Sequence, residues 1–166
     1  FDRISATNSV IVGGCCNFMN AKSFNSVMIG GKFGCSADYM VDSAIIGGCK
    51  GSISGKNYRS SILGGDCNLL AGDNKNSTIL GGCRNIVSSS CESSIMGGLC
   101  NCISSATSSS NIIGGRFGCI QSAGFSTIIG GCDNTMCCGS CNSTIVGGCN
   151  NIICCSSTRL YWVVKI

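Results

Sequence analysis

The sequence is marked first by what it lacks. Its 166 residues include no proline and no histidine, and only 11% of them are charged. The absence of histidine excludes histidine-dependent catalysis and histidine-ligated metal. Aromatic residues amount to 6%, with a single tryptophan, which is too few for a conventional core built on large rings. No apolar run approaches the roughly 18 residues of a membrane helix, so no membrane span is expected.

The small number of charged residues also limits the classes of partner that the chain is expected to bind. The formal net charge is only +4, and the basic residues occur singly along the chain. A protein that tracks phosphates needs a basic patch or stripe, so no nucleic-acid partner is expected. Disorder is not expected either, because 44% of the residues are hydrophobic. The sequence begins at Phe1 and shows no signal peptide, so we expect a mature product or a fragment of a longer protein.

Glycine, with 25 residues, shows the organisation of the chain, because nine Gly-Gly pairs recur every 16 or 17 residues. The first pair begins at Gly13 and the last at Gly147. Serine stands four residues before each pair, and two aliphatic residues directly precede it. Asn or Gly follows three residues after the second glycine, usually with another aliphatic residue two positions later. The consensus is Ser-x-Φ-Φ-Gly-Gly-x-x-Asn/Gly-x-Φ, where Φ is aliphatic, and a repeat of this length indicates a solenoid.

Each repeat predicts one coil of an all-β, parallel β-solenoid. The Ser-x-Φ-Φ segment is rich in β-branched residues and too short for a helix, so it is expected to be a strand that Gly-Gly ends. Asn or Gly in the next turn favours a left-handed backbone position, and x-Φ begins a second, shorter strand. The return loop is expected to absorb the difference between 16 and 17 residues. Nine coils spaced about 4.8 Å apart predict a rod of roughly 40 Å.

Residues at equivalent places in successive coils should stack into ladders. The structural core ladder is predicted at Ile11, Met28, Ile45, Ile62, Ile79, Ile95, Ile112, Ile128 and Ile145. The turn ladder is predicted at Asn17, Gly34, Gly51, Asn68, Asn85, Asn101, Gly118, Asn134 and Asn151. The coils should occupy residues 8–157, after a lead-in at 1–7. Residues 158–166 leave the repeat and hold the only tryptophan, so they are expected to be a cap or the start of a following domain.

Two adjacent aliphatic residues before every Gly-Gly pair predict a surface stripe. Neighbouring side chains on a strand point to opposite faces, so one of the two fills the coil and the other forms an apolar stripe along the rod. A stripe of this kind normally marks an interface, and we expect a threefold bundle to bury it. The alternative is a wider monomeric solenoid that uses both faces internally.

The pattern Ser77-Thr78-Ile79-Leu80-Gly81-Gly82-Cys83-Arg84-Asn85 resembles the head repeats of trimeric autotransporter adhesins of the YadA-like kind, and more closely the repeats of phage and large-DNA-virus fibre proteins. The resemblance covers about residues 8–155. It implies a left-handed β-roll packed as a homotrimer, which serves as shaft or head of an attachment fibre on a virion surface or outside the cell, with a host receptor or glycan as partner. Adhesin repeats are typically shorter and poor in cysteine, which favours a viral fibre.

The 17 cysteines recur at particular places in the repeat. The spacing between coils lies within the Cα separation that disulfides accept, so Cys132–Cys149 and Cys102–Cys119 are candidate disulfides between adjacent coils. An odd number leaves at least one thiol over, so bonds between chains also remain open. A ladder of free, small, slightly apolar thiols is an equally good interpretation. The segment 137–141 lacks the paired ligands of a zinc site, and no metal or cofactor is expected.

No catalytic constellation emerges, so the chain is not expected to be an enzyme. The seven carboxylates form no pair in neighbouring coils, and no histidine is present to activate a cysteine. A monomeric binding solenoid is the functional alternative, either a glycan-binding adhesin or an ice-binding protein. Phe33 and Phe117 recur in one register and could serve a glycan. An ice-binding face would need a regular Thr or Ser array, and the place three residues before each Gly-Gly pair is irregular.

Overall fold

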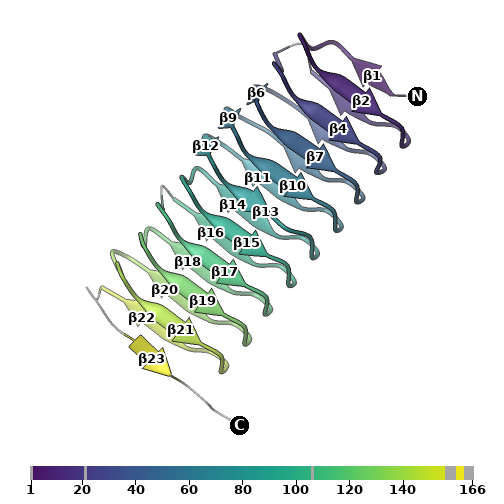
Figure 1. Ribbon diagram of the computed structural model, residues 1–166. Coiled ribbons are helices and arrows are strands. Elements are labelled where there is room, and N and C mark those ends of the chain that lie inside the picture. The colour runs from purple at the N-terminus through teal and green to yellow at the C-terminus, as the bar shows by residue number, and fades with distance from the viewer. Residues whose placement is uncertain (1, 21, 106, 156–159, 163–166) are drawn as a thin grey trace.

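The computed structural model, described here for residues 2–20, 22–105, 107–155 and 160–162, is a parallel β-solenoid of about nine turns. The coils stack in one straight rod, with the two chain ends at opposite ends of the stack (Figure 1). Every strand pairs with the equivalent strand of the neighbouring coil in parallel register, for example Ile62 with Ile45 and Ile79. The predicted all-β, parallel solenoid is therefore confirmed, and no helix in the described residues could cross a membrane.

The first of three sheets, here called the front sheet, carries the Ser-x-Φ-Φ segments. It contains ten strands, and the nine that belong to the repeat each begin directly after the repeated serine. The strands are β2 (Val10–Val12), β4 (Val27–Ile29), β7 (Ala44–Ile46), β10 (Ser61–Leu63), β13 (Thr78–Ile79), β15 (Ser94–Met96), β17 (Asn111–Ile113), β19 (Thr127–Ile129), β21 (Thr144–Val146) and β23 (Leu160–Trp162).

The second sheet, here called the back sheet, is formed by the shorter x-Φ segments that follow the Asn/Gly turn. It also contains ten strands, one from each coil and one from the lead-in. They are β1 (Arg3–Ile4), β3 (Phe18–Met19), β5 (Cys35–Ser36), β8 (Ser52–Ile53), β11 (Leu69–Ala71), β14 (Ile86–Ser88), β16 (Cys102–Ser104), β18 (Cys119–Gln121), β20 (Thr135–Cys137) and β22 (Ile152–Cys154).

A third, three-stranded sheet lies in the return segment of the earlier coils, at β6 (Met40–Val41), β9 (Asn57–Tyr58) and β12 (Asn74–Lys75). Isolated bridges such as Lys75–Cys91 continue its column into later coils. The 16-residue coils omit one residue at this corner: Ser90 directly follows the left-handed Ser89, whereas Asp73 separates Asn74 from the left-handed Gly72. The one-residue difference in coil length therefore lies in the return loop, as predicted.

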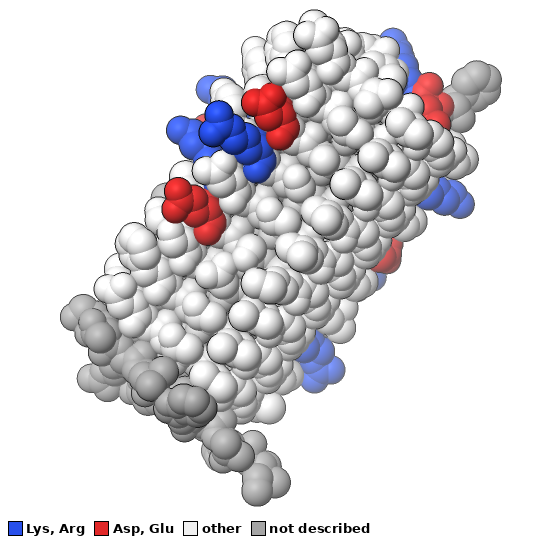
Figure 2. Space-filling model, viewed as in Figure 1, with Lys and Arg blue, Asp and Glu red and all other residues white. Residues whose placement is uncertain are grey.

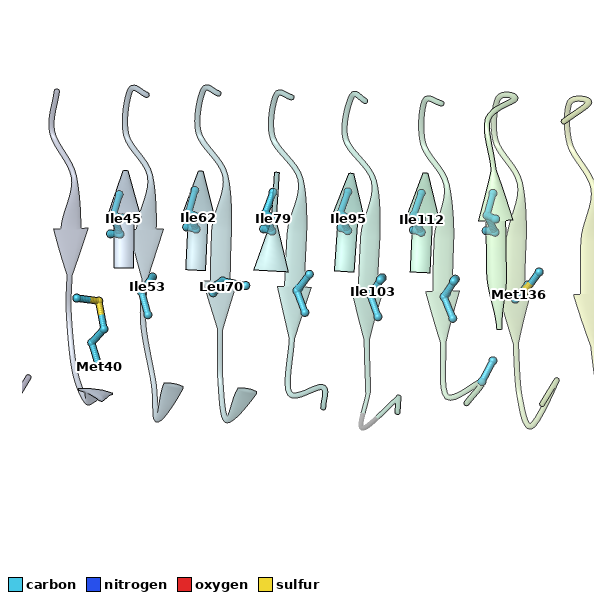
Figure 3. Packing of buried hydrophobic residues seen from close by; sticks show 14 of the residues in the cluster. Met40, Ile45, Ile53, Ile62, Leu70, Ile79, Ile95, Ile103, Ile112 and Met136 are labelled. Carbon is cyan, nitrogen blue, oxygen red and sulfur yellow. The ribbon is translucent and has the colours of Figure 1, made fainter. Parts of the chain in front are cut away.

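The core is a narrow space between the front and back sheets. The middle residue of each front strand points inward and meets the aliphatic side chain of the back strand, as the rows of Ile45, Ile62 and Ile79 against Ile53 and Leu70 show (Figure 3). Side chains from Met28 to Ile145 in the predicted core ladder are buried, and Ile11 packs against this cluster while half-buried. The core ladder is thus the centre of the fold.

The ends of the repeat continue the sheets. Arg3–Ile4, in the lead-in, pairs with β3, and Leu160–Trp162, in the predicted cap segment, pairs with β21. The lead-in therefore contributes a strand to the back sheet, and the C-terminal segment contributes a tenth strand to the front sheet. The remainder of the predicted cap, at 158–159 and 163–166, lies outside the described residues.

Candidate interaction surfaces

The serine that recurs in every repeat builds a continuous polar ladder inside the coil. In successive coils the backbone N–H of one repeated serine donates to the hydroxyl of the previous one, as from Ser60 to Ser43 at 3.0 Å. The same hydroxyl donates to a backbone carbonyl two residues earlier, as from Ser43 to Val41 at 2.8 Å. Because both hydrogen-bonding capacities are used, these serines can be buried beside the aliphatic core without an unsatisfied group.

The asparagines of the turn ladder hold the Gly-Gly turns together. The Nδ2 of Asn101 donates to the carbonyl of Gly97 in its own coil at 3.3 Å and to that of Gly114 in the next coil at 3.2 Å. Its Oδ1 accepts from the backbone N–H of Gly118 at 2.8 Å. Asn17, Asn68, Asn85 and Asn134 are buried in the same way, and Asn151 is half-buried. The ladder therefore joins each turn to its neighbours.

The predicted left-handed conformation does not lie on the turn ladder itself, and this expectation is wrong. The residue before each ladder position has the positive φ, for example 59° at Cys16 and 55° at Arg84. The reason is that the asparagine side chain must turn inward to reach the Gly-Gly carbonyls, whereas the residue before it occupies the corner with its side chain outside. Gly34, Gly51 and Gly118 take the ladder position without the side-chain bonds.

The outward face of the front sheet carries no charge over its whole length. In the nine strands of the repeat, the two outward positions hold one aliphatic residue and one residue that is Val, Ala, Ser, Thr or Asn. Figure 2 shows this face as an unbroken uncharged surface, with Lys, Arg, Asp and Glu confined to its edges. The aliphatic stripe consists of Val12, Ile29, Ile46, Leu63, Leu80, Met96, Ile113, Ile129 and Val146, and its first eight members are 38–52% exposed. The stripe predicted from sequence is therefore on the outside of the coil.

The return corner carries a polar surface. A hollow there is lined by Asp42, Tyr58, Arg59, Lys75 and Asn76, from three successive coils. Asp42, Arg59 and Asn76 share one left-handed ladder position, with φ near 50° at each, so their side chains all project outward. The Tyr58 ring is 40% exposed beside them. This corner brings an aromatic face, two cations, a carboxylate and an amide together on the surface.

The two phenylalanines considered for glycan binding lie far from this hollow. Phe33 and Phe117 project from the edge of the coil that lies between each Gly-Gly pair and the turn ladder, here called the Gly-Gly edge. They are five coils apart, and each is 45% exposed. Lys32 lies over the Phe33 ring at 5.2 Å, and Arg116 lies over the Phe117 ring at 5.5 Å. The structure therefore does not bring these rings together into one site.

The cysteines gather on the outside of the coil. The Gly-Gly edge holds Cys15, Cys16, Cys49, Cys67, Cys83, Cys100, Cys132 and Cys149, all with free thiols. Both candidate pairs stack in register between adjacent coils, Cys102 with Cys119 and Cys132 with Cys149, and their thiols are also free. The disulfide in the structure joins Cys137 to Cys154, 17 residues apart with a Cα–Cα distance of 4.9 Å. Among the described residues, no group of three or more metal-binding side chains comes together.

Sequence reasoning missed one buried ladder. Three residues before each repeated serine, the return corner points an inward side chain at the core, and most of these side chains are small and polar. The ladder comprises Ser23, Met40, Asn57, Asn74, Ser90, Thr107, Ala123 and Ser140. Asn74 donates to Asn57 Oδ1 at 2.9 Å, and Thr107 donates to the Ser90 hydroxyl at 2.9 Å. The constant offset from serine was the available signal, but the varied residue types obscured it.

Comparison with family models, curated proteins and solved structures finds no match to this chain. Inference about function therefore depends on the surfaces described above.

Proposed function

We propose that this chain is a non-catalytic structural module of an attachment fibre, a shaft or head segment in which three copies pack side by side. The observation that carries the proposal is the uncharged front face with its aliphatic stripe. The coil already encloses a complete core between its own front and back sheets, so the stripe is not needed to fill it. A regular apolar stripe left outside a closed core is a feature that association would bury.

The energetics favour association along the whole rod. Full burial of a large aliphatic side chain contributes about 1.5–3 kcal/mol, and the stripe residues are roughly half accessible, so covering each one would contribute about 1 kcal/mol. The contribution repeats in every coil at the same place, so parallel copies in register would gain it throughout. Outward charges are absent from this face, and no desolvation of ions opposes the contact. A homotrimer about a common axis, with left-handed coils as the resemblance implies, is the simplest arrangement.

The proposed location is a virion surface or another extracellular site, where such a module would present receptor-binding features along its edges. The corner hollow at Tyr58 and Arg59 is the feature that best suits a host-surface receptor or glycan. An exposed aromatic ring can pack against the apolar face of a sugar, and Arg59, Lys75 and Asn76 can bind its polar groups. The same hollow would serve a monomeric binding solenoid, which is the second candidate function.

The oligomeric state tests the proposal directly. Light scattering of the native chain should give a mass about three times 16.9 kDa. Leu80→Glu places a charge in the stripe and should shift the mass to that of a monomer. Leu99→Glu is the matched control, because Leu99 is similarly exposed but lies on the Gly-Gly edge and not on the front face. A monomer for the unmodified chain, or equal effects of the two substitutions, would refute the trimer.

A glycan array then separates the two candidate functions. Binding by the intact chain that is lost in both Tyr58→Ala and Arg59→Gln, with Phe117→Ala unchanged, would support the corner hollow as the receptor contact. If the chain is a monomer and still binds through this hollow, the binding solenoid becomes the preferred function. No binding to any glycan would remove the glycan from the proposal and leave a protein receptor.

A further inference from the structure

Cys102 of β16 and Cys119 of β18 face each other across adjacent coils on the outward side of the back sheet. The two residues are Cα partners in the parallel register, and both are half-buried. Their thiols are hydrogen-bonded to each other. Two thiols in this arrangement need only small rotations about their side-chain bonds to meet.

The same sheet already holds a disulfide of this kind. Cys137 and Cys154 lie on the same outward face, in β20 and β22, and are also Cα partners in adjacent coils. Their Cα atoms are 4.9 Å apart, within the range that a disulfide accepts. Cys102 and Cys119 are likewise separated by 17 residues, so the backbone offers both pairs the same stacking.

We propose that Cys102 and Cys119 form a thiol–disulfide exchange site that reacts with low-molecular-mass disulfides such as oxidised glutathione and closes to a staple between two coils. Cys102 is the attacking residue and Cys119 is the resolving residue. Neither side chain belongs to the hydrophobic core, so the pair can react without removing a core contact.

The chemistry balances in two exchanges. The Cys102 thiolate attacks one sulfur of oxidised glutathione, a Cys102–glutathione disulfide forms, and one glutathione thiolate leaves. Cys119 then loses its proton to solvent and attacks the Cys102 sulfur, the Cys102–Cys119 bond forms, and the second glutathione thiolate leaves. Two protein thiols are oxidised by two electrons, and one glutathione disulfide is reduced to two thiols.

The electrostatics assign the roles. The hydrogen bond from the Cys119 thiol lowers the pKa of Cys102 to about 7, against the opposing effect of burial. The same hydrogen bond, followed by burial, raises the pKa of Cys119. The pKa of Cys102 is therefore lower than that of Cys119, so Cys102 loses its proton first. The attacking form of a cysteine is its thiolate, which is why Cys102 reacts first.

Another stacked pair provides a matched control within the chain. Cys132 and Cys149 also lie opposite each other in adjacent coils, but on the Gly-Gly edge. The Cys132 thiol donates to the Asp133 carboxylate at 2.9 Å, and this bond raises its pKa even though Arg116 opposes the shift. The stacking is shared, but the Cys132 thiolate is disfavoured, so Cys132 should react slowly.

Site-resolved alkylation by iodoacetamide tests the assignment of roles in the full reduced chain. At pH 6.5, Cys102 should react roughly tenfold faster than Cys132, because its higher thiolate fraction outweighs its lower intrinsic nucleophilicity. The Cys102 rate should level off above pH 7.5, whereas the Cys132 rate should still rise at pH 9. Equal rates, or the same pH profile at both residues, would refute the proposed attacking residue.

Exposure to oxidised glutathione at pH 7, followed by acid quenching and peptide mass spectrometry, tests the exchange itself. The unmodified chain should show the Cys102–Cys119 disulfide before any Cys132–Cys149 disulfide. In Cys119→Ser the glutathione adduct should accumulate on Cys102, and in Cys102→Ser the adduct on Cys119 should form at least tenfold more slowly. Circular dichroism of both variants establishes that they fold. A stable adduct on Cys102 in the unmodified chain, or a Cys132–Cys149 bond forming first, would overturn the proposal.

Discussion

The two glycines of a Gly-Gly turn should differ sharply in their tolerance of a side chain, and Gly47 and Gly48 form a matched pair. Both have positive φ, 67° and 80°. A Cβ on Gly47 would meet nothing within 4 Å. A Cβ on Gly48 would lie 2.6 Å from the Gly65 carbonyl oxygen and 2.9 Å from the Gly64 carbonyl carbon, both in the next coil. The clash is with backbone, so no side-chain rotation relieves it.

The expected magnitudes follow from these contacts. Gly47→Ala should cost about 1–2 kcal/mol, the penalty for placing an L-residue in the left-handed region. Gly48→Ala should incur that penalty and a further 1–3 kcal/mol or so, because overpacking must separate two coils or distort the turn. Urea unfolding followed by circular dichroism measures both. Hydrogen exchange of the neighbouring coil amides would localise the damage if the rod does not unfold in one step.

A conservative variant separates the two causes. Gly47→Asn should recover part of the loss seen in Gly47→Ala, since asparagine tolerates positive φ better than alanine. Gly48→Asn should recover nothing, because its Cβ meets the same carbonyl group. Equal destabilisation by the two alanine substitutions would mean that coil-to-coil contact does not require glycine, and would refute this reasoning.

Three further variants test the interior ladders and the disulfide. Asn101→Asp removes the donor that serves the Gly-Gly carbonyls and buries a carboxyl group whose pKa must rise in the folded state. Chemical unfolding should therefore show a loss of stability that grows as the pH increases above about 4. A loss of stability that is independent of pH would contradict this expectation. Ser110→Ala should lower the free energy of unfolding in urea by about 1–3 kcal/mol, because the Ser126 N–H, which donates to the Ser110 hydroxyl, would be left buried and unpaired. Unchanged stability would show that water replaces the hydroxyl. The double variant Cys137→Ser/Cys154→Ser should lower stability by up to about 3 kcal/mol. It should also abolish any effect of reductant on hydrogen exchange in the two coils that the disulfide joins. Continued sensitivity to reductant would mean that another disulfide contributes.

The sequence predicts the repeat-based features well because stacking makes one residue type recur at one place. The strands and the core ladder both follow from the consensus Ser-x-Φ-Φ-Gly-Gly. The outward stripe follows from strand alternation alone, since Ile45 and Ile46 must face opposite ways. Such arguments need only the period and the pleat.

Features that depend on side-chain hydrogen bonding could not be predicted in the same way. Asparagine in a turn favours positive φ in general, but Asn101 instead points inward to four backbone groups, and the left-handed role passes to Cys100. The Cys137–Cys154 bond was missed because these residues share no recurring cysteine position with the other coils. Tolerance of several residue types at the return corner likewise concealed its buried ladder.

The parallel register has a mechanical consequence. Hydrogen bonds between strands run along the rod, so every coil-to-coil contact carries a tension applied along the axis, and an end coil can peel away while the others stay stacked. A 17-residue coil that rises about 4.8 Å when folded spans about 55 Å when extended, so each release would lengthen that segment of the rod about tenfold. The Cys137–Cys154 bond would prevent the two coils that it joins from separating in this way. A rod of such coils would therefore lengthen under tension, and the Cys137–Cys154 bond would determine which coils stay together.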